Sequence, residues 1–276
     1  MEFVSDVLTL KVDGPIATLW LDRIGARNAM GAAFWRDLPL AAAHVAQLLE
    51  VRVVVLAARG PHFTVGLDLK ELGGGLFHDG THATSRAQRN ARNYAEVRRM
   101  QDAVSSIARL AVPVVAAVHG YCIGGGVDLI CATDIRLCSS DAVFSVRETK
   151  VAIVADIGTL QRLPRIVGAG HVAELALTGK DVDAGYAHHI GLVNSVHEGG
   201  ADGVYQAALN VARDIAANSP LAVKGTKAVL AANDGRTVDE GLDFVARWNT
   251  LYLESNDLRE AMIAFVEKRA PEFRGD

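Results

Sequence analysis

The stretch IGGGVDL at residues 123–129, together with RETKVAIVADIGTLQRLP at residues 147–164, carries most of the information about fold and site. The two segments place three carboxylates, Asp128, Glu148 and Asp156, in otherwise apolar, glycine-rich sequence. Carboxylates are costly to bury unless the protein needs them in that position. The three residues are therefore candidate acid/base groups.

Two glycine-containing turns accompany these carboxylates. In HGYCIGGGVDL, residues 119–129, a buried strand is expected to run into consecutive glycines and then a helix. The first N–H groups of a helix lack partners and lie at the positive end of its dipole, so such a turn can bind an anion, although a simple tight turn is also possible. In HFTVGLDLKEL, residues 62–72, a strand ends at Gly66. Backbone amides near Leu67 and Gly125 would together form an oxyanion hole.

The glycines and carboxylates also have other interpretations. The glycine spacing does not match G-x-G-x-x-G, which disfavours NAD but leaves it open. Asp128 could stabilise the first turn of its helix, and Asp156 could cap the next one. Glu148 could form an ion pair with Arg147 or Lys150. The clustering of acids with anion-binding turns favours catalysis.

Composition limits the classes of protein to be considered. The 276 residues are 50% hydrophobic, enough for the core of one large domain, and the net charge of −4 argues against nucleic acid as a partner. The odd number of cysteines, three, lacks metal-ligand spacing, so we expect reduced thiols and no metal. Neither a secretory signal nor an apolar run of ~18 residues is recognisable. We therefore expect a cytoplasmic protein that does not associate with membranes.

Apolar periodicity predicts an α/β core followed by a helical C-terminal third. A turn is expected at 120–126, and the glycine-rich stretch 73–85 is expected to be a mobile loop of the kind that gates pockets. Strands are predicted at 8–14, 16–22, 51–58, 112–120, 135–140 and 142–146, the first two forming a hairpin, and helices at 33–49, 86–110, 170–178, 183–190, 202–218, 220–232 and 236–266, the last broken near 255–257.

Four motifs together resemble the crotonase superfamily, which has the enoyl-CoA hydratase/isomerase fold. They are LDRIGARNAM (21–30), FTVGLDL (63–69), VHGYCIGGGVDLICATDIRLCSSDAVFSV (118–146) and FVEKRAPEF (265–273). The resemblance spans nearly the whole chain. It implies an α/β spiral of ββα units.

The resemblance also implies a domain organisation and partners. Residues 1–200 would form the spiral core with a CoA-thioester site, and residues 201–276 a helical C-terminal region that mediates trimerisation. The assembly would be a homotrimer or a hexamer built as a dimer of trimers. The substrates would be acyl-CoA thioesters of fatty acid metabolism, in reactions such as those of β-oxidation. Their enolates would lie against the N–H groups of Leu67 and Gly125.

The carboxylates indicate a subgroup. Hydratases of this family typically carry PGAGGTQRL where this chain has VADIGTLQRLP, and an acid at Asp156 is similar to the Δ3,5-Δ2,4-dienoyl-CoA isomerases. That resemblance implies a catalytic set in which Glu148 handles the proton at carbon 2, Asp156 handles the proton at carbon 6, and Asp128 acts on its neighbours. A 2-enoyl-CoA hydratase, with Asp128 and Glu148 holding water, is the alternative. A catalytically silent acyl-CoA-binding module is an alternative of another class.

CoA is part of the substrate in this family, so no separate cofactor is expected. The resemblance suggests Arg23, Arg27 and Lys268, the last from a neighbouring subunit, as contacts to the CoA phosphates. It suggests that the backbone around Ala26 and Asp68 approaches the adenine and pantetheine. The first segment departs from the family's usual proline-lysine pair, and ordinary solvated surface is an equally good interpretation of each basic residue.

Overall fold

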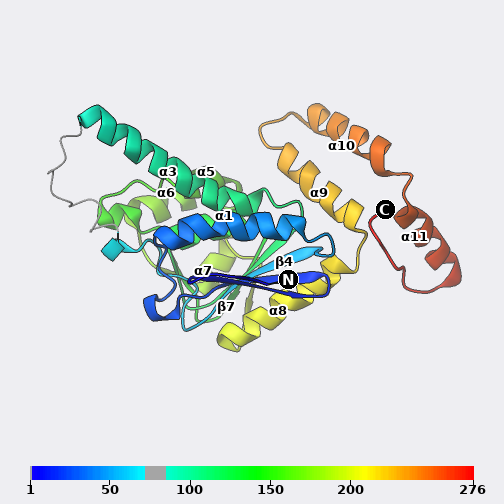
Figure 1. Ribbon diagram of the computed structural model, residues 1–276, viewed down its shortest axis with the longest axis horizontal. Helices are drawn as coiled ribbons and strands as arrows, with labels where there is room; N and C mark the ends of the chain where they lie inside the picture. Colours follow the sequence, from blue (N-terminus) through cyan, green and yellow to red (C-terminus); the bar gives the residue numbers. More distant parts are fainter. Residues whose placement is uncertain (1, 72–84) are drawn as a thin grey trace.

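The computed structural model describes residues 2–71 and 85–276 of the chain (Figure 1). The loop expected at 73–85 lies outside these residues, apart from Ser85. Ser85 is the N-cap of a long helix, where its hydroxyl accepts from the Gln88 N–H while the Gln88 side chain accepts from the Ser85 N–H. This capping box explains why the helix begins where it does.

A seven-stranded sheet forms the centre of the fold, with strand order β1-β2-β3-β4-β5-β7-β10. Strand β2 pairs antiparallel with both β1 and β3, and the remaining strands continue in parallel from β3. The hairpin predicted from the sequence is β2–β3, and Gly14 takes a positive φ of 54° at its turn. The strands are β1 (Phe3–Val4), β2 (Leu8–Asp13), β3 (Ile16–Leu21), β4 (Val53–Ala58), β5 (Val114–Val118), β7 (Ile135–Ser139) and β10 (Ser195–His197).

A second, three-stranded sheet has the order β6-β8-β9. Its strands are β6 (Tyr121–Ile123), β8 (Val143–Ser145) and β9 (Val182–Asp183). The turn predicted at 120–126 is therefore wrong in part, because β6 occupies its first half. Isolated parallel bridges join Thr64 to Cys122 and Met30 to Leu67, so the segment around Gly66 runs alongside this sheet.

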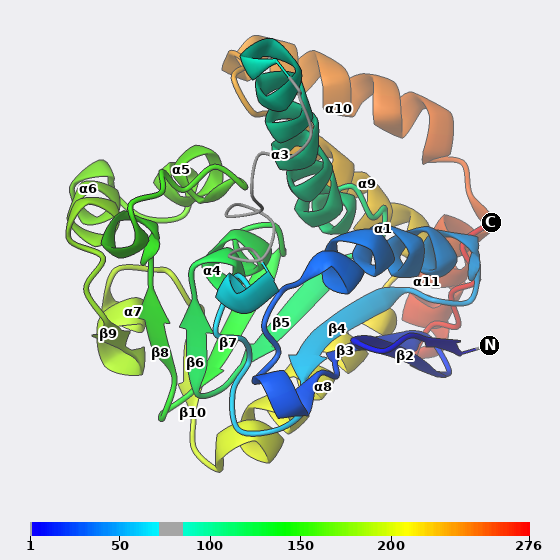
Figure 2. The same ribbon diagram turned by 60° about the vertical axis from the view of Figure 1, so that its left-hand side comes forward.

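Helices cover both faces of the large sheet. Helices α1 (Ala32–Gln47) and α3 (Arg86–Ala108) pack together over one face, and α8 (Gly200–Ala216) covers the other (Figure 2). Every residue of β4 is buried, which explains why its sequence is apolar without alternation. Helix α8 presents small residues at every fourth position to the sheet and can therefore approach it closely: Val204, Ala208, Ala212 and Ala216.

Shorter helices connect the strands and each other along the chain, and three longer ones follow α8. In Figure 1, α9, α10 and α11 extend to one side of the sheet. Helix α9 is anchored by an ion pair of 2.7 Å between Lys227 Nζ and Asp134 Oδ2. The short helices are η1 (Ile24–Ala26), α4 (Gly125–Ile130), η2 (Glu148–Val151), α5 (Thr159–Arg162), η3 (Leu163–Arg165), α6 (Ala169–Thr178) and α7 (Ala184–His189), and the C-terminal ones are α9 (Pro220–Ala232), α10 (Val238–Tyr252) and α11 (Asn256–Glu267).

The α/β architecture predicted from the sequence is confirmed, and the long elements lie within a few residues of their predicted bounds. The break expected near 255–257 separates α10 from α11. The predictions missed β1, β9 and β10, which have only two or three residues each. Within the described residues, none of the helices is long and apolar enough to cross a membrane.

Candidate active site

One pocket brings together four of the residues selected from the sequence. Leu67, Gly125, Glu148 and Asp156 all line a cavity of about 100 Å³. They come from four separate segments: the turn after Gly66, the start of α4, the 3-10 helix η2 and the loop before α5. The cavity therefore exists only in the folded chain.

Two backbone amides meet at this pocket because the segments that carry them touch. Gly66 has a positive φ of 84°, and a Cβ placed there would lie 2.6 Å from the Ile123 carbonyl oxygen and 3.6 Å from the Gly125 nitrogen. Only glycine permits this approach without strain. Within the part of the chain that the structure describes, neither the Leu67 N–H nor the Gly125 N–H donates a hydrogen bond to another residue. Both donors are thus available to an anion.

Glu148 is the most strongly perturbed carboxyl group of the pocket. Burial, followed by the nearby charge of Asp128, raises the pKa of Glu148 to about 7. Its Oε2 atom is buried and has no hydrogen-bond partner among the described residues. The alternative ion pair with Arg147 or Lys150 is wrong, because within the same residues Glu148 forms no ion pair and Arg147 bonds to Asp181. Glu148 is therefore suited to exchange a proton near neutral pH.

Asp128 lies behind the pocket and is only 1% exposed. It sits in the first turn of α4, and its Oδ1 atom accepts a hydrogen bond of 2.5 Å from the Thr159 N–H at the start of α5. Its Oδ2 atom has no partner in the described part of the chain. Burial raises the pKa of Asp128 to about 6. Asp128 thus links the helix that carries Gly125 to the segment that carries Asp156.

Asp156 is half-buried, and burial raises its pKa. It is not the cap of α5: the N-cap residue is Gly158, and the carboxylate that accepts the first amide of that helix belongs to Asp128. The side chain of Gln101, on α3, donates a 2.6 Å hydrogen bond to the Asp156 carbonyl oxygen. Neither Gln101 nor Thr159 is identified by the sequence analysis. Their partners, Asp156 and Asp128, are distant in the sequence, and no local pattern marks either residue as a contact.

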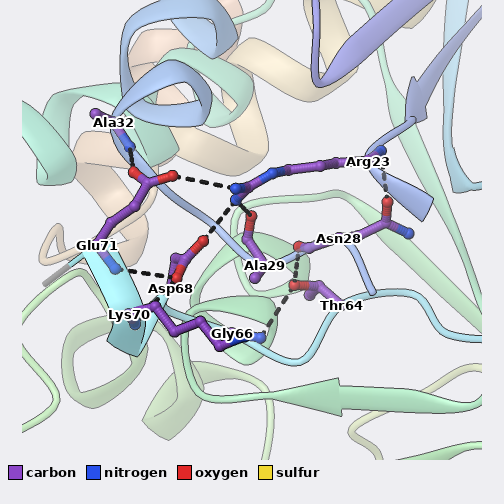
Figure 3. A network of polar contacts seen from close by, with 9 residues as sticks. All are labelled: Arg23, Asn28, Ala29, Ala32, Thr64, Gly66, Asp68, Lys70 and Glu71. Atoms are coloured by element: carbon purple, nitrogen blue, oxygen red, sulfur yellow. Dashed lines mark hydrogen bonds and ion pairs between the residues drawn. The ribbon is translucent and has the colours of Figure 1, made fainter. Parts of the chain in front are cut away.

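The suggested CoA contacts fall into three groups. Arg23 and Asp68 bind each other, with Arg23 Nη1 2.7 Å from Asp68 Oδ2 (Figure 3). Ala26 and Arg27 lie at η1, and the Arg27 carbonyl accepts from the Val65 N–H just before Gly66. Lys268 follows α11, which both ribbon views place well away from α5 within one chain. A role for Lys268 in this pocket would therefore require a second copy.

Comparison with known proteins agrees with this geometry. The model of the family described as enoyl-CoA hydratase/isomerase matches residues 12–276. An enoyl-CoA hydratase from Bacillus anthracis superimposes with a TM-score of 0.87 at 27% identity, covering 98% of this chain and 100% of that one. The fold is therefore the crotonase fold.

Curated relatives extend the match. A peroxisomal Δ(3,5)-Δ(2,4)-dienoyl-CoA isomerase from Arabidopsis thaliana is 40% identical over 97% of this chain and 96% of its own. A mitochondrial protein of the same name from Dictyostelium discoideum is 42% identical over 94% of this chain and 87% of its own. The chain belongs to the enoyl-CoA hydratase/isomerase family. It is an enzyme of the dienoyl-CoA isomerase-like kind within that family, and the family implies acyl-CoA thioester substrates.

Proposed function

We propose that this enzyme converts a 3,5-dienoyl-CoA to the 2,4-dienoyl-CoA. The observation that carries the proposal is that Asp156 lines the same pocket as Glu148 and the two free backbone amides. Moving two double bonds toward the thioester requires removing a proton at carbon 2 and adding one at carbon 6. One carboxylate is poorly placed to serve both ends of that conjugated chain, and this pocket has two.

The proposed reaction begins at carbon 2. Glu148, ionised, takes the carbon 2 proton, and the electron pair moves onto the thioester oxygen. The N–H groups of Leu67 and Gly125 stabilise the resulting extended enolate, each donor of this kind being worth ~10²–10³ in rate. Asp156, protonated, then delivers a proton to carbon 6 as the electrons return from the oxygen. Double bonds at carbons 3 and 5 become double bonds at carbons 2 and 4.

The proposed cycle closes by proton exchange. After one turnover Glu148 carries a proton and Asp156 has lost one, so the two must return to their starting states through solvent or each other. The pKa of Glu148, about 7, suits this exchange near neutral pH, and burial raises the pKa of Asp156 above its ordinary value. Asp128 contributes through its charge and through its bond to the Thr159 amide, which orients the segment that carries Asp156.

A 2-enoyl-CoA hydratase is the second candidate, and one observation weighs against it. Hydration would require Asp128 and Glu148 to hold one water between them, but Asp128 is almost fully buried and does not line the pocket. A silent acyl-CoA-binding module would have no need of three carboxylates with raised pKa values. Both alternatives remain outcomes of the test below.

The test compares two thioesters with the purified protein. With 3,5-dienoyl-CoA we expect the absorbance of the conjugated 2,4-dienoyl thioester to appear, and with 2-enoyl-CoA we expect slow or undetectable loss of the enoyl absorbance. Fast water addition without diene migration would favour the hydratase. Binding of both thioesters without turnover would favour the silent module.

We also propose that the chain forms a trimer or a dimer of trimers through its C-terminal helices. The support is a set of large apolar side chains on α10 and α11 that no other described residue of the same chain covers. Phe265 is 84% exposed and Val266 is 78% exposed. Such an assembly would give Lys268, together with Ala26 and Arg27, the opportunity to contact CoA. The cytoplasmic location expected from composition likewise stays a prediction.

A further inference from the structure

We propose that Arg23 is a positioning residue that, through Asp68 and Glu71, holds the Leu67 N–H in its oxyanion-binding orientation, and does not bind a CoA phosphate. The proposal rests on the proposed function only in assuming that a thioester oxygen binds at Leu67. It assigns Arg23 a role different from the CoA-phosphate contact that the family resemblance suggested, and it gives the Asp68 side chain a role besides the suggested backbone contact. It also brings in Glu71, which the sequence did not single out.

Both Nη atoms of the Arg23 guanidinium already donate to neighbouring acceptors (Figure 3). Its Nη1 atom donates to Asp68 Oδ2 at 2.7 Å and to the Ala29 carbonyl at 3.1 Å, and its Nη2 atom donates to Glu71 Oε1 at 3.1 Å. The Arg23 side chain is 30% exposed and that of Asp68 is 9% exposed. A partly buried guanidinium with two carboxylate partners is held more firmly than an exposed ion pair.

The two carboxylates in turn hold backbone amides. Asp68 Oδ1 accepts from the N–H groups of Lys70 and Glu71, at 3.1 and 3.2 Å. Glu71 Oε2 accepts from the N–H of Ala32, the first residue of α1, at 2.8 Å. A Cβ on residue 31 would overlap the Glu71 carboxylate, so the glycine at this position makes room for that carboxylate. The network thus fixes residues 66–71 to the start of a sixteen-residue helix.

Leu67 lies in the middle of these contacts. The Met30 N–H donates to the Gly66 carbonyl at 2.8 Å, and the Asp68 N–H donates to the Met30 carbonyl at 3.1 Å. These two bonds flank Leu67 and set the plane of its peptide. The Ala29 carbonyl, one residue before Met30, is the third acceptor of Arg23. Arg23 thus holds both segments that the Met30–Leu67 bridge joins, through Ala29 on one and Asp68 on the other. Loss of Arg23 would therefore loosen the orientation of the Leu67 amide.

The charge of the cluster of Arg23, Asp68 and Glu71 also supports a positioning role. One guanidinium faces two carboxylates, so the cluster carries a net charge of about −1 and would repel a phosphate. Asp68 also directly follows the oxyanion-binding residue, where an uncompensated carboxylate would oppose a developing negative charge. Arg23 offsets that charge. Its removal should therefore disturb the oxyanion site both by geometry and by electrostatics.

The test uses a chromophoric thioester that needs no turnover. 4-(Dimethylamino)cinnamoyl-CoA absorbs at longer wavelength when hydrogen-bond donors polarise its thioester oxygen. We expect the wild type to shift its absorbance to longer wavelength, and Arg23→Met to lose at least about half of that shift. Arg23→Met should lose the same fraction of the shift when the ligand is the corresponding pantetheine thioester, which carries no CoA phosphate. With a substrate that is turned over, kcat should fall ~10–100-fold with little change in KM.

Control variants separate positioning from folding. Arg23→Lys, which can contact one carboxylate at a time, should recover part of the spectral shift. Glu71→Gln keeps an acceptor for the Ala32 N–H but loses the pair with Arg23, so it should give an intermediate loss even if Arg23→Met folds poorly. Arg109→Met, which removes the exposed pair with Asp102 at the far end of α3, should leave the shift unchanged.

Three results would overturn the inference. The first is a wild type that produces no spectral shift, and the second is a Glu71→Gln variant whose shift equals that of the wild type. The third is an Arg23→Met variant that keeps the full shift and loses affinity only for the CoA thioester, which would make Arg23 a phosphate ligand. Failure of diene migration alone, with the shift pattern intact, would count against the proposed function and leave this inference standing.

Discussion

At the scale of single residues, the ionisation of Glu148 is set by its neighbours. The pKa of Glu148 is about 7, so kcat/KM should rise with pH through about this value as the base loses its proton. Asp128→Asn removes a negative charge that helps raise this pKa. We therefore expect the acidic limb of the pH profile to move to lower pH in Asp128→Asn and to stay in place in Asp102→Asn. An acidic limb that does not move, or that moves to higher pH, would contradict the electrostatic role of Asp128.

The same carboxylate should affect stability in a pH-dependent manner. Folding raises the pKa of Asp128 to about 6, so ionisation of this carboxyl group opposes folding. The resulting loss of stability develops as the pH rises from about 4 through about 6. The amide in Asp128→Asn cannot ionise, and its oxygen can still accept the Thr159 N–H. We expect this substitution to increase the free energy of unfolding relative to the wild type by up to about 3 kcal/mol at about pH 8, and by little at about pH 4. Urea unfolding at both pH values measures the difference, and an equal effect at both would refute it.

At the scale of elements, two turns must approach each other to make the oxyanion site. In Gly66→Ala the new Cβ would meet the Ile123 carbonyl at 2.6 Å, so the Leu67 amide should shift and kcat should fall by ~10². Gly14→Ala is the matched control, because Gly14 also has a positive φ but an added Cβ there meets nothing within 4 Å. It should lower stability by about 1–2 kcal/mol without lowering kcat. Equal activity in the two variants would contradict this account of the turn.

The sequence could predict individual elements and individual acids, but not the contacts between them. The apolar runs of β4 and β5 and the carboxylates at 128, 148 and 156 stand out locally, so both could be recognised. Contacts between distant residues could not. Asp128 meets Thr159 across 31 positions, and Arg23 meets Asp68 across 45, and nothing in either local sequence specifies its partner. Strands of two or three residues, such as β9, are too short to show a periodicity.

At the scale of the whole molecule, the apolar side chains of α11 lie on the outside of a single chain. We expect the wild type to behave as a trimer or hexamer in light scattering. Phe265→Asp should reduce the mass to that of a monomer, because it places a charge in the proposed interface. Leu177→Asp is the control, since Leu177 is 78% exposed and lies on α6, which both ribbon views place on the opposite side of the molecule from α11. A wild-type monomer, or a Phe265→Asp protein with unchanged mass, would contradict the proposed assembly.

The central proposal divides two proton transfers between Glu148 and Asp156, and Asp156→Asn tests it most directly. The measurement follows exchange of the carbon 2 proton with deuterated solvent and, in the same sample, migration of the diene to the 2,4 position. Because Glu148 and the oxyanion donors remain, we predict that exchange stays within about tenfold of the wild type while migration falls ~10²–10⁴-fold. Migration at the wild-type rate, or loss of exchange and migration to the same degree, would contradict the assignment of Asp156 to carbon 6.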